Sequence, residues 1–430
     1  MKKFGIGASI ITFVFVSIFV TSCIIEVNSI GDPHFNNDGA PQDSSLTFFT
    51  PVRPESVKLY IETSGSMNGF FRANKPTNFK KTVWSVFSGL SHRTDGKVYT
   101  MSNGGDIDTP VALTDFRTKM NAGKFVSNSS THIPAMLLNI LQNIDTAKSE
   151  VAVLVSDMKY SPTGISAATD LLQYQEQIRN LVALFPKLSF SFSFVCATSE
   201  YLNNNGTVAE QKSPYIFLII GKSDNVAAIR NDISRWCEAT GAYVESGDMG
   251  MDYHTPSYEI KDVKNGVLSK LYPKNLITDY DSSVSDTCSF IYRVNMTGFP
   301  WSAVDPKVLK DALNVKTVYG SLVDVELLTE DGHLVDNHAW EGEFERCSYA
   351  DYLVKLYNFG LADEVLEIKF SNKPIDGCYF VEFNNMITTD NEKNLSGLFS
   401  FNKFLEGVFN AKLNTSDKEP VRILVSSYQD

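Results

Sequence analysis

Hydrophobic and polar residues follow two different patterns along this chain, and the pattern changes near residue 250. Before that point, short apolar runs are separated by segments whose apolar residues recur at helical spacing. The runs predict strands at 57–61, 97–101, 111–113, 151–156, 188–196 and 215–221, and the helical spacing predicts helices near 79–90, 132–144, 165–185 and 225–238. Such alternation is typical of an α/β fold with a doubly wound, mostly parallel sheet covered by helices on both faces. The predicted domain spans 51–247, and its segment 114–130 is expected to be irregular.

Beyond residue 250, strand-like runs follow one another without helices between them. Residues 248–286 are predicted to form a linker with one helical turn near 268–271. The strand-like runs are at 290–296, 317–328, 352–358, 365–370, 379–383 and 421–425. They predict an antiparallel β-sandwich over 287–430, with an immunoglobulin-like arrangement as one subtype. A helix-like segment at 401–409 is expected to cross one edge or end of this sandwich.

The amino terminus has the form of a bacterial export signal. Met1-Lys2-Lys3 is positively charged, and the apolar run that follows is shorter than the roughly 20 residues needed to span a bilayer. The run ends in Val20-Thr21-Ser22-Cys23, which resembles a lipobox and implies cleavage after residue 22 and lipidation of Cys23. An ordinary signal peptide and an uncleaved anchor are the alternatives. Ile24 rather than aspartate follows the cysteine, which by resemblance to lipoprotein sorting signals implies a lipid-anchored protein of the bacterial outer membrane.

Composition and charge indicate how the chain reaches the membrane and which kinds of partner it is expected to bind. Residues 23–50 are rich in Asn, Asp, Gly, Pro and Ser, which predicts a flexible tether between the lipidated cysteine and the folded body. The chain carries a net charge of −12 and has no long basic run. Nucleic acid and anionic lipid are therefore not expected as electrostatic partners, and the membrane is expected to be reached through the lipid anchor alone.

Five cysteines follow Cys23, which is an odd number for disulfide pairing. None lies in a C-x-x-C arrangement, and no His/Cys cluster has the spacing of a zinc site. Most are expected to be buried and unpaired, as small apolar residues. They are Cys196, Cys237, Cys288, Cys347 and Cys378.

A small polar loop follows the strand predicted at 57–61. Ser64 and Ser66 are two residues apart, so both hydroxyl groups are expected on the same side of an extended turn, with the carboxylate of Glu62 beside them. Ligand sites of open α/β sheets lie at the carboxyl ends of strands. Closely packed hard oxygen ligands suit Mg²⁺ first, and Mn²⁺ or Ca²⁺ as alternatives. The loop therefore predicts a divalent-cation site.

Glu62-x-Ser64-x-Ser66 resembles the D-x-S-x-S signature of von Willebrand factor A (VWA) domains. That family completes its metal-ion-dependent adhesion site with a threonine on a second loop and an aspartate after a later strand. Thr131, before the helix predicted at 132–144, and Asp157, after the strand predicted at 151–156, match these positions. The resemblance implies that Ser64, Ser66 and Thr131 bind the metal directly.

The same resemblance assigns Glu62 and Asp157 as acidic groups that bind directly or through water. Two positions depart from the family's pattern. Glu62 is one methylene longer than the usual aspartate, and Met158 occupies the position where the family usually has glycine.

The function expected from these residues is non-catalytic: a membrane-anchored lipoprotein that recognises or scaffolds a protein partner through its metal site. By the family's mechanism, an acidic side chain of the partner would complete the coordination. One alternative is an envelope serine hydrolase that uses Ser64 or Ser66 with His132, although the sequence around Ser66 is not the G-x-S-x-G elbow. The other is a structural envelope component whose metal site is vestigial.

Overall fold

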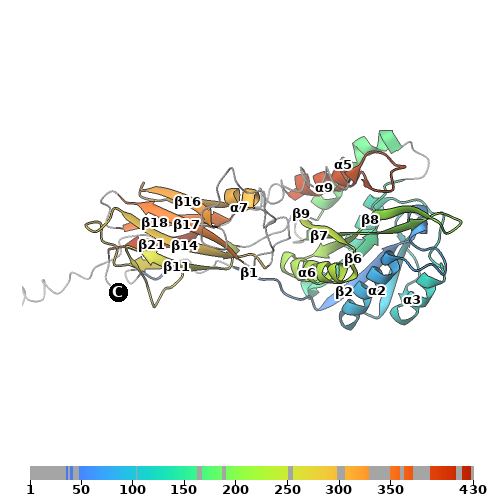
Figure 1. Cartoon of the computed structure of the whole chain (residues 1–430), viewed down its shortest axis with the longest axis horizontal. Helices are drawn as coiled ribbons and strands as arrows, with labels where there is room; N and C mark the ends of the chain where they lie inside the picture. The colour runs from blue at the N-terminus through green and yellow to red at the C-terminus, as the bar shows by residue number, and fades with distance from the viewer. Residues whose placement is uncertain are drawn as a thin grey trace, which may run out of the picture.

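The computed structural model describes residues 35–36, 39–41, 48–102, 104–161, 167–185, 190–249, 255–297, 306–328, 349–358, 363–370, 388–412 and 419–427. They form an α/β part built on one large sheet and a β-rich part built on two smaller sheets, arranged along the long axis of the molecule (Figure 1). The fold is thus mixed α/β, with additional, largely antiparallel sheets. The predicted signal peptide and Cys23 lie outside the described residues.

The large sheet has eight strands in the order β4-β3-β2-β6-β8-β7-β9, and β5 pairs with β3. The strands are β2 (Ser56–Glu62), β3 (Lys97–Ser102), β4 (Asp106–Ile107), β5 (Val111–Ala112), β6 (Glu150–Ser156), β7 (Ser191–Leu202), β8 (Val208–Gly221) and β9 (Tyr243–Met249). All seven residues of β6 are buried, because the sheet is covered on both faces. The site described below is at the carboxyl ends of β2 and β6.

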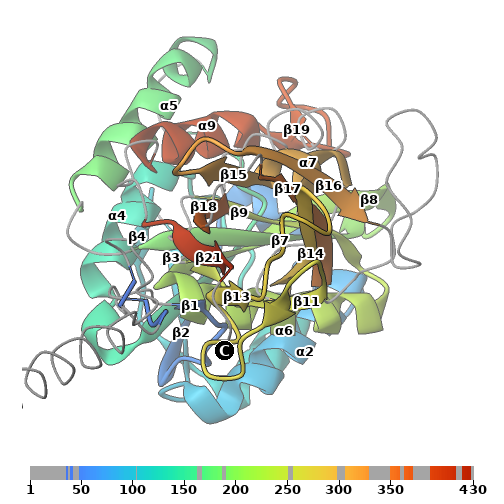
Figure 2. The same cartoon turned by 90° about the vertical axis from the view of Figure 1, so that its left-hand side faces the viewer.

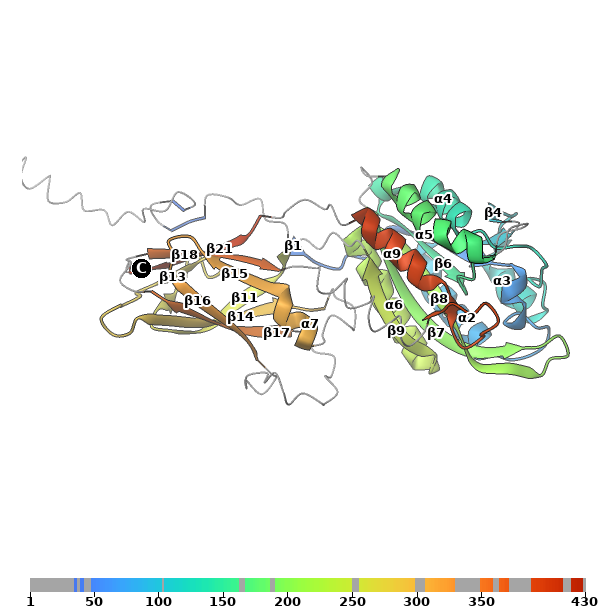
Figure 3. The same ribbon diagram turned by 90° about the horizontal axis from the view of Figure 1, so that it is seen from above.

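Helices cover both faces of this sheet (Figure 3). One face carries α2 (Asn78–Leu90) and α6 (Ser223–Thr240), with α3 (Leu113–Asn121) packed beside α2. The other carries α4 (Ile133–Asn143), α5 (Ala167–Ala183) and α9 (Phe401–Lys412). The helix α3 corrects the prediction of an irregular segment. Its buried residues Leu113, Phe116 and Met120 recur at helical spacing.

The prediction of a mostly parallel sheet is wrong. In this sheet, only the neighbouring pairs β3–β2 and β2–β6 are parallel. β8 pairs antiparallel with both β6 and β7, and β9 pairs antiparallel with β7. The cause is a hairpin. β7 and β8 extend past the predicted strand ends to a turn in which the Asn203 N–H donates to the Thr207 carbonyl, 2.8 Å away. Gly206 in that turn has a φ of +79°, a conformation that glycine adopts readily.

The β-rich part consists of two sheets. One is antiparallel, in the order β11-β14-β17-β16, and the other has the order β12-β13-β21-β18-β15. Their strands are β11 (Tyr258–Lys264), β12 (Val267–Leu268), β13 (Leu276–Thr278), β14 (Thr287–Asn295), β15 (Leu313–Thr317), β16 (Leu322–Leu328), β17 (Tyr349–Tyr357), β18 (Asp363–Phe370) and β21 (Val421–Ser426), and α7 (Pro306–Ala312) precedes β15. The prediction of a fully antiparallel sandwich is wrong for the second sheet, because the pair β13–β21 is parallel.

Two further predictions need correction in this region, and a third is untested. The segment expected to be a linker contains the strands β11, β12 and β13, and alternating burial along β11 is typical of a strand with one face in water. The run expected as one strand at 317–328 is two strands in different sheets, β15 and β16. The run at 379–383 lies outside the described residues.

The chain passes between the two parts more than once. α9, expected to cross an edge or end of the sandwich, packs instead along α5, as Figures 1 and 2 both show. Phe401 of α9 meets Phe194 of β7 edge-to-face, with ring centroids 5.4 Å apart. Gly407 allows the contact with α5, because a Cβ there would lie 2.7 Å from the Gln175 carbonyl oxygen. The chain then returns to the β-rich part as β21.

The segment predicted to be a flexible tether is partly packed. Phe35 is only 2% exposed and lies in an apolar cluster with Leu276, Val365 and Leu424 of the β-rich part. β1 (Phe48–Phe49) pairs in parallel with β10 (Thr255–Pro256). Burial of an aromatic ring outweighs the turn-forming composition of its neighbours.

Three of the cysteines lie among the described residues. Cys196, Cys237 and Cys288 are buried with free thiols, as predicted, whereas Cys347 and Cys378 lie outside the described residues. Within the described parts of the chain, no helix is both long and apolar enough to cross a membrane.

Candidate functional site

The five predicted site residues come together at one rim of the large sheet. β2 and β6 are parallel neighbours, with Ile61 opposite Val155, so Glu62 at the end of β2 and Asp157 just after β6 emerge side by side. Thr131 lies two residues before α4 and forms an antiparallel bridge with Ser161, downstream of β6. Parallel strands therefore bring together residues that are far apart in the sequence.

The five side chains are joined in two hydrogen-bonded groups. In one, the Ser64 and Ser66 hydroxyl oxygens are 2.9 Å apart, and Ser66 Oγ donates to Asp157 Oδ1 over 3.1 Å. In the other, Thr131 Oγ1 donates to Glu62 Oε1 over 2.6 Å. A side-chain hydrogen bond from Ser64 to Glu62 joins the two groups, and the charge of Asp157 also acts on Glu62. All five residues lie in a single polar cluster.

Ser156 is a member of the site that the sequence did not indicate. It is fully buried, its hydroxyl donates to Glu62 Oε2, and it accepts a hydrogen bond of 2.7 Å from the Met158 N–H. It was assigned only as the last residue of an apolar strand. Its position directly before Asp157 at the strand end is the signal that could have revealed it.

Backbone contacts fix the loop that carries the two serines. The loop continues as the short helix η1 (Gly65–Gly69), and the Gly65 N–H donates to the Ser129 carbonyl at 2.9 Å. The Ser129 hydroxyl in turn donates to the Thr63 carbonyl at 3.1 Å, and the Tyr201 hydroxyl donates to the Ser66 carbonyl at 2.9 Å. Thr131's loop and the β7–β8 hairpin thus hold the serine loop from two sides.

The site is open on one side only. Glu62, Ser64 and Thr131 are each about 1% exposed, whereas Ser66 and Asp157 are partly exposed. Lys159, two residues after Asp157, forms an ion pair of 3.6 Å with Glu392. A molecule approaching from solvent would meet Ser66 and Asp157 first.

Burial shapes the protonation of both carboxyl groups. It raises the pKa of Glu62 to about 7, and the negative charge of Asp157 adds to the rise, while hydrogen bonds from Ser156, Ser64 and Thr131 act in the opposite direction. Burial also raises the pKa of Asp157, opposed by hydrogen bonds from the Lys159 N–H and the Ser66 hydroxyl. Two carboxyl groups held this close in a buried site favour a bound positive charge.

The backbone after Asp157 is strained. Met158 has a φ of +53°, and its side chain is fully buried. A residue with a Cβ adopts this left-handed conformation at a cost of about 1–2 kcal/mol. The surrounding packing therefore enforces a turn that directs Asp157 toward the serine loop.

His132 acts as the N-cap of α4. Its Nδ1 accepts a hydrogen bond of 3.1 Å from the Ala135 N–H, which places the ring proton on Nε2. A general base for a serine must accept a proton on the nitrogen that faces the hydroxyl. The capping contact therefore uses the nitrogen of His132 that is available as an acceptor.

The donor set of the site consists mainly of hydroxyl groups. Among the described residues, no group of three or more His, Cys, Asp and Glu is arranged to hold a metal ion. The candidate set has two carboxylates and three hydroxyl groups, all oxygen donors of the kind that hard cations prefer. A cation here would depend on the hydroxyl oxygens and on water or a partner to complete its coordination.

The spacing of these oxygens suits a small octahedral cation. Mg–O distances of about 2.0–2.1 Å require neighbouring ligand oxygens about 2.9 Å apart, because adjacent ligands subtend a right angle. The Ser64–Ser66 spacing is 2.9 Å and the Ser66–Asp157 spacing 3.1 Å. Both spacings also equal ordinary hydrogen-bond lengths between hydroxyl and carboxylate oxygens. They are compatible with such an ion between Ser64, Ser66 and Asp157.

Comparisons of this chain with protein-family models, with curated proteins and with solved structures gave no match. The chemistry of the site is therefore inferred from its own residues.

Proposed function

We propose that this chain is a VWA-like lipoprotein that binds a protein partner through a divalent cation, Mg²⁺ first among the candidates, held by Ser64, Ser66 and Thr131. The observation that carries the proposal is the convergence of these hydroxyl groups with Glu62 and Asp157 at the carboxyl ends of two parallel strands. The cation would compensate the charge of the two buried carboxyl groups.

The backbone at Met158 supports the likeness to VWA domains. The family usually has glycine at this position, and glycine adopts a positive φ without strain. Met158 has a φ of +53°, a conformation that glycine would adopt more readily than methionine.

The partner would supply the group that completes the coordination. The open side of the site is lined by Ser66 and Asp157, and the backbone N–H of Lys159 donates to Asp157 Oδ1 at 3.1 Å. The ammonium group of Lys159 is ion-paired with Glu392. An acidic side chain of a partner fits this setting, because a carboxylate oxygen is a ligand that a hard cation prefers. The lipid anchor at Cys23 would keep the protein at the outer membrane.

The capping role of His132 favours binding over hydrolysis. A serine hydrolase built on Ser64 or Ser66 would need the imidazole of His132 as its base, and the acceptor nitrogen already caps α4. The proposed function is accordingly non-catalytic.

Calorimetric titration of Mg²⁺ and Mn²⁺ into the full-length chain tests the proposal. Binding in the micromolar-to-millimolar range is expected, and Ser66→Ala should abolish it. Ser283→Ala is the matched control, because the Ser283 hydroxyl also donates to an aspartate, Asp281, at 2.6 Å, but on an exposed turn. Absence of binding in the parent chain would instead support a vestigial site.

A further inference from the structure

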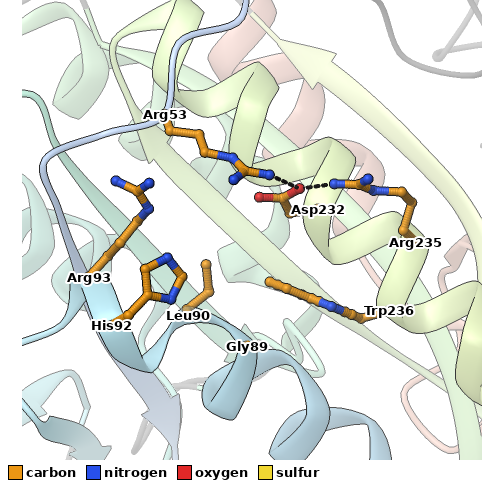
Figure 4. A pocket seen from close by; sticks show the side chains of 8 residues that line it. All are labelled: Arg53, Gly89, Leu90, His92, Arg93, Asp232, Arg235 and Trp236. Atoms are coloured by element: carbon orange, nitrogen blue, oxygen red, sulfur yellow. Dashed lines mark hydrogen bonds and ion pairs between the residues drawn. The ribbon is translucent and has the colours of Figure 1, made fainter.

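A second pocket lies at the opposite end of the large sheet from the serine loop. It has a volume of about 290 Å³ and is formed between the carboxyl end of α2, the following short helix η2 (Ser91–Arg93), the middle of α6 and the segment that leads into β2 (Figure 4). Arg53 precedes β2 and Arg93 precedes β3, so the pocket is at the amino ends of these strands. The pocket residues are Arg53, Gly89, Leu90, His92, Arg93, Asp232, Arg235 and Trp236.

Positive charge dominates the lining. Arg53 and Arg235 both contact the same oxygen, Oδ1 of Asp232, and approach it from opposite sides (Figure 4). The Arg53 contact is 3.4 Å long, and the two arginine side chains remain 57% and 61% exposed, so the guanidinium groups keep donors directed to solvent. One carboxylate is thus shared between two cations.

Arg93 adds a third guanidinium group. It donates to the Pro54 carbonyl at 2.7 Å, and among the described residues it has no ion pair with a carboxylate. With His92 neutral, the pocket carries three positive charges and one negative charge, whereas the whole chain carries a net charge of −12. A cationic cavity on an acidic protein concentrates anions locally.

Trp236 contributes an aromatic ring to the pocket lining, beside the charged groups of α6. Asp232, Arg235 and Trp236 lie on one face of α6, because residues three and four positions apart on a helix are neighbours. The Trp236 ring rests directly on α2 at Gly89, where a Cβ would lie 2.5 Å from a ring carbon. Glycine at this position therefore makes room for the indole at the side of the cavity.

We infer that this pocket binds a small molecule that carries an oxyanion, a carboxylate or a phosphate, on a planar ring. The guanidinium fork matches the geometry of either oxyanion and can bind it through two parallel hydrogen bonds. A planar ring of the ligand would stack on or against Trp236. A cavity of about 290 Å³ is at the small end of the range for ligand pockets.

Calorimetric titrations of the full-length chain at fixed ionic strength test this inference. The probes are phenyl phosphate and benzoate, with phenol as the neutral analogue and inorganic phosphate as the ringless one. At least one aromatic anion should bind with a Kd of roughly 0.1–1 mM. Comparison of phenyl phosphate with benzoate then distinguishes the phosphate from the carboxylate.

Variants locate the binding. Arg93→Gln and Trp236→Leu should each weaken the aromatic anion at least about tenfold, whereas Arg179→Gln, which removes an exposed arginine of α5, should leave it unchanged. Arg93→Lys keeps the charge without the fork and should restore only part of the affinity. Thermal unfolding of each variant identifies any that fail to fold.

Three results would overturn the inference: no saturable binding of either aromatic anion, binding that the pocket variants do not weaken, or inorganic phosphate or phenol binding as tightly as the aromatic anions. Because the pocket shares no residue with the serine loop, metal titrations and anion titrations can fail independently.

Discussion

Replacing Glu62 with glutamine should stabilise the protein at alkaline pH while removing its affinity for cations. The carboxyl group is about 1% exposed, and burial raises its pKa to about 7 from the ordinary value of 4.5. A carboxyl group whose pKa is raised on folding binds its proton more tightly in the folded state. The protonated carboxyl group of Glu62 therefore stabilises the folded state. This stabilisation is fully present below about pH 4.5 and is lost as the pH rises through about 7.

The magnitude follows from the size of the shift. A rise from 4.5 to about 7, at about 1.36 kcal/mol per unit of pKa, corresponds to roughly 3 kcal/mol of stability lost between acid and alkaline pH. Glutamine keeps the shape of the side chain, accepts a hydrogen bond from one hydroxyl and donates to another, and carries no charge. At pH 8, Glu62→Gln should therefore be more stable than the parent by up to about 3 kcal/mol.

Urea unfolding at pH 5, 6, 7 and 8, without added divalent cations, measures this difference. The parent should lose stability over this range relative to Glu62→Gln. Asp157→Asn is an informative companion, because the charge of Asp157 contributes to the raised pKa of Glu62. Removing this charge should lower the pKa of Glu62, so the loss of stability should be smaller and should occur at lower pH than in the parent. Parallel pH profiles for the parent and Glu62→Gln would refute the reasoning.

Three other substitutions test buried contacts elsewhere in the fold. Asp248→Asn should destabilise the protein by about 3–5 kcal/mol in urea unfolding, because it leaves the fully buried guanidinium of Arg230 without its carboxylate. Gly69→Ala should cost about 1–3 kcal/mol, since its Cβ would lie 2.4 Å from the Tyr201 ring, and Tyr201→Leu in the same chain should recover part of the loss. Glu364→Ala should lower the melting temperature, because this buried carboxylate accepts hydrogen bonds from the backbone N–H groups of the turn between β15 and β16; an unchanged melting temperature would contradict that role.

Local patterns predicted much of the α/β part. The strands β2 and β6 and the helices α2, α4 and α6 lie close to their predicted positions, because each has a strong apolar period and clear ends. The convergence of Glu62, Ser64, Ser66, Thr131 and Asp157 followed from the geometry of neighbouring parallel strands.

One failure has a local cause, and the other two have tertiary causes. The hairpin that makes half of the large sheet antiparallel depends on the turn at Asn203–Thr207, which was not recognised as a turn signal between two long strands. Phe35 is buried by contacts with β13, β18 and β21, all more than two hundred residues away in the sequence. The docking of α9 on α5 depends in the same way on a partner surface that no local pattern encodes.

The most direct test of the proposed metal site is anomalous diffraction from crystals of the protein grown with saturating Mn²⁺. The account predicts a single strong peak within bonding distance of the hydroxyl oxygens of Ser64, Ser66 and Thr131, with Glu62 and Asp157 beside it directly or through water. No peak at this rim, with the hydrogen bonds from Thr131 to Glu62 and from Ser66 to Asp157 retained, would contradict the metal-dependent account.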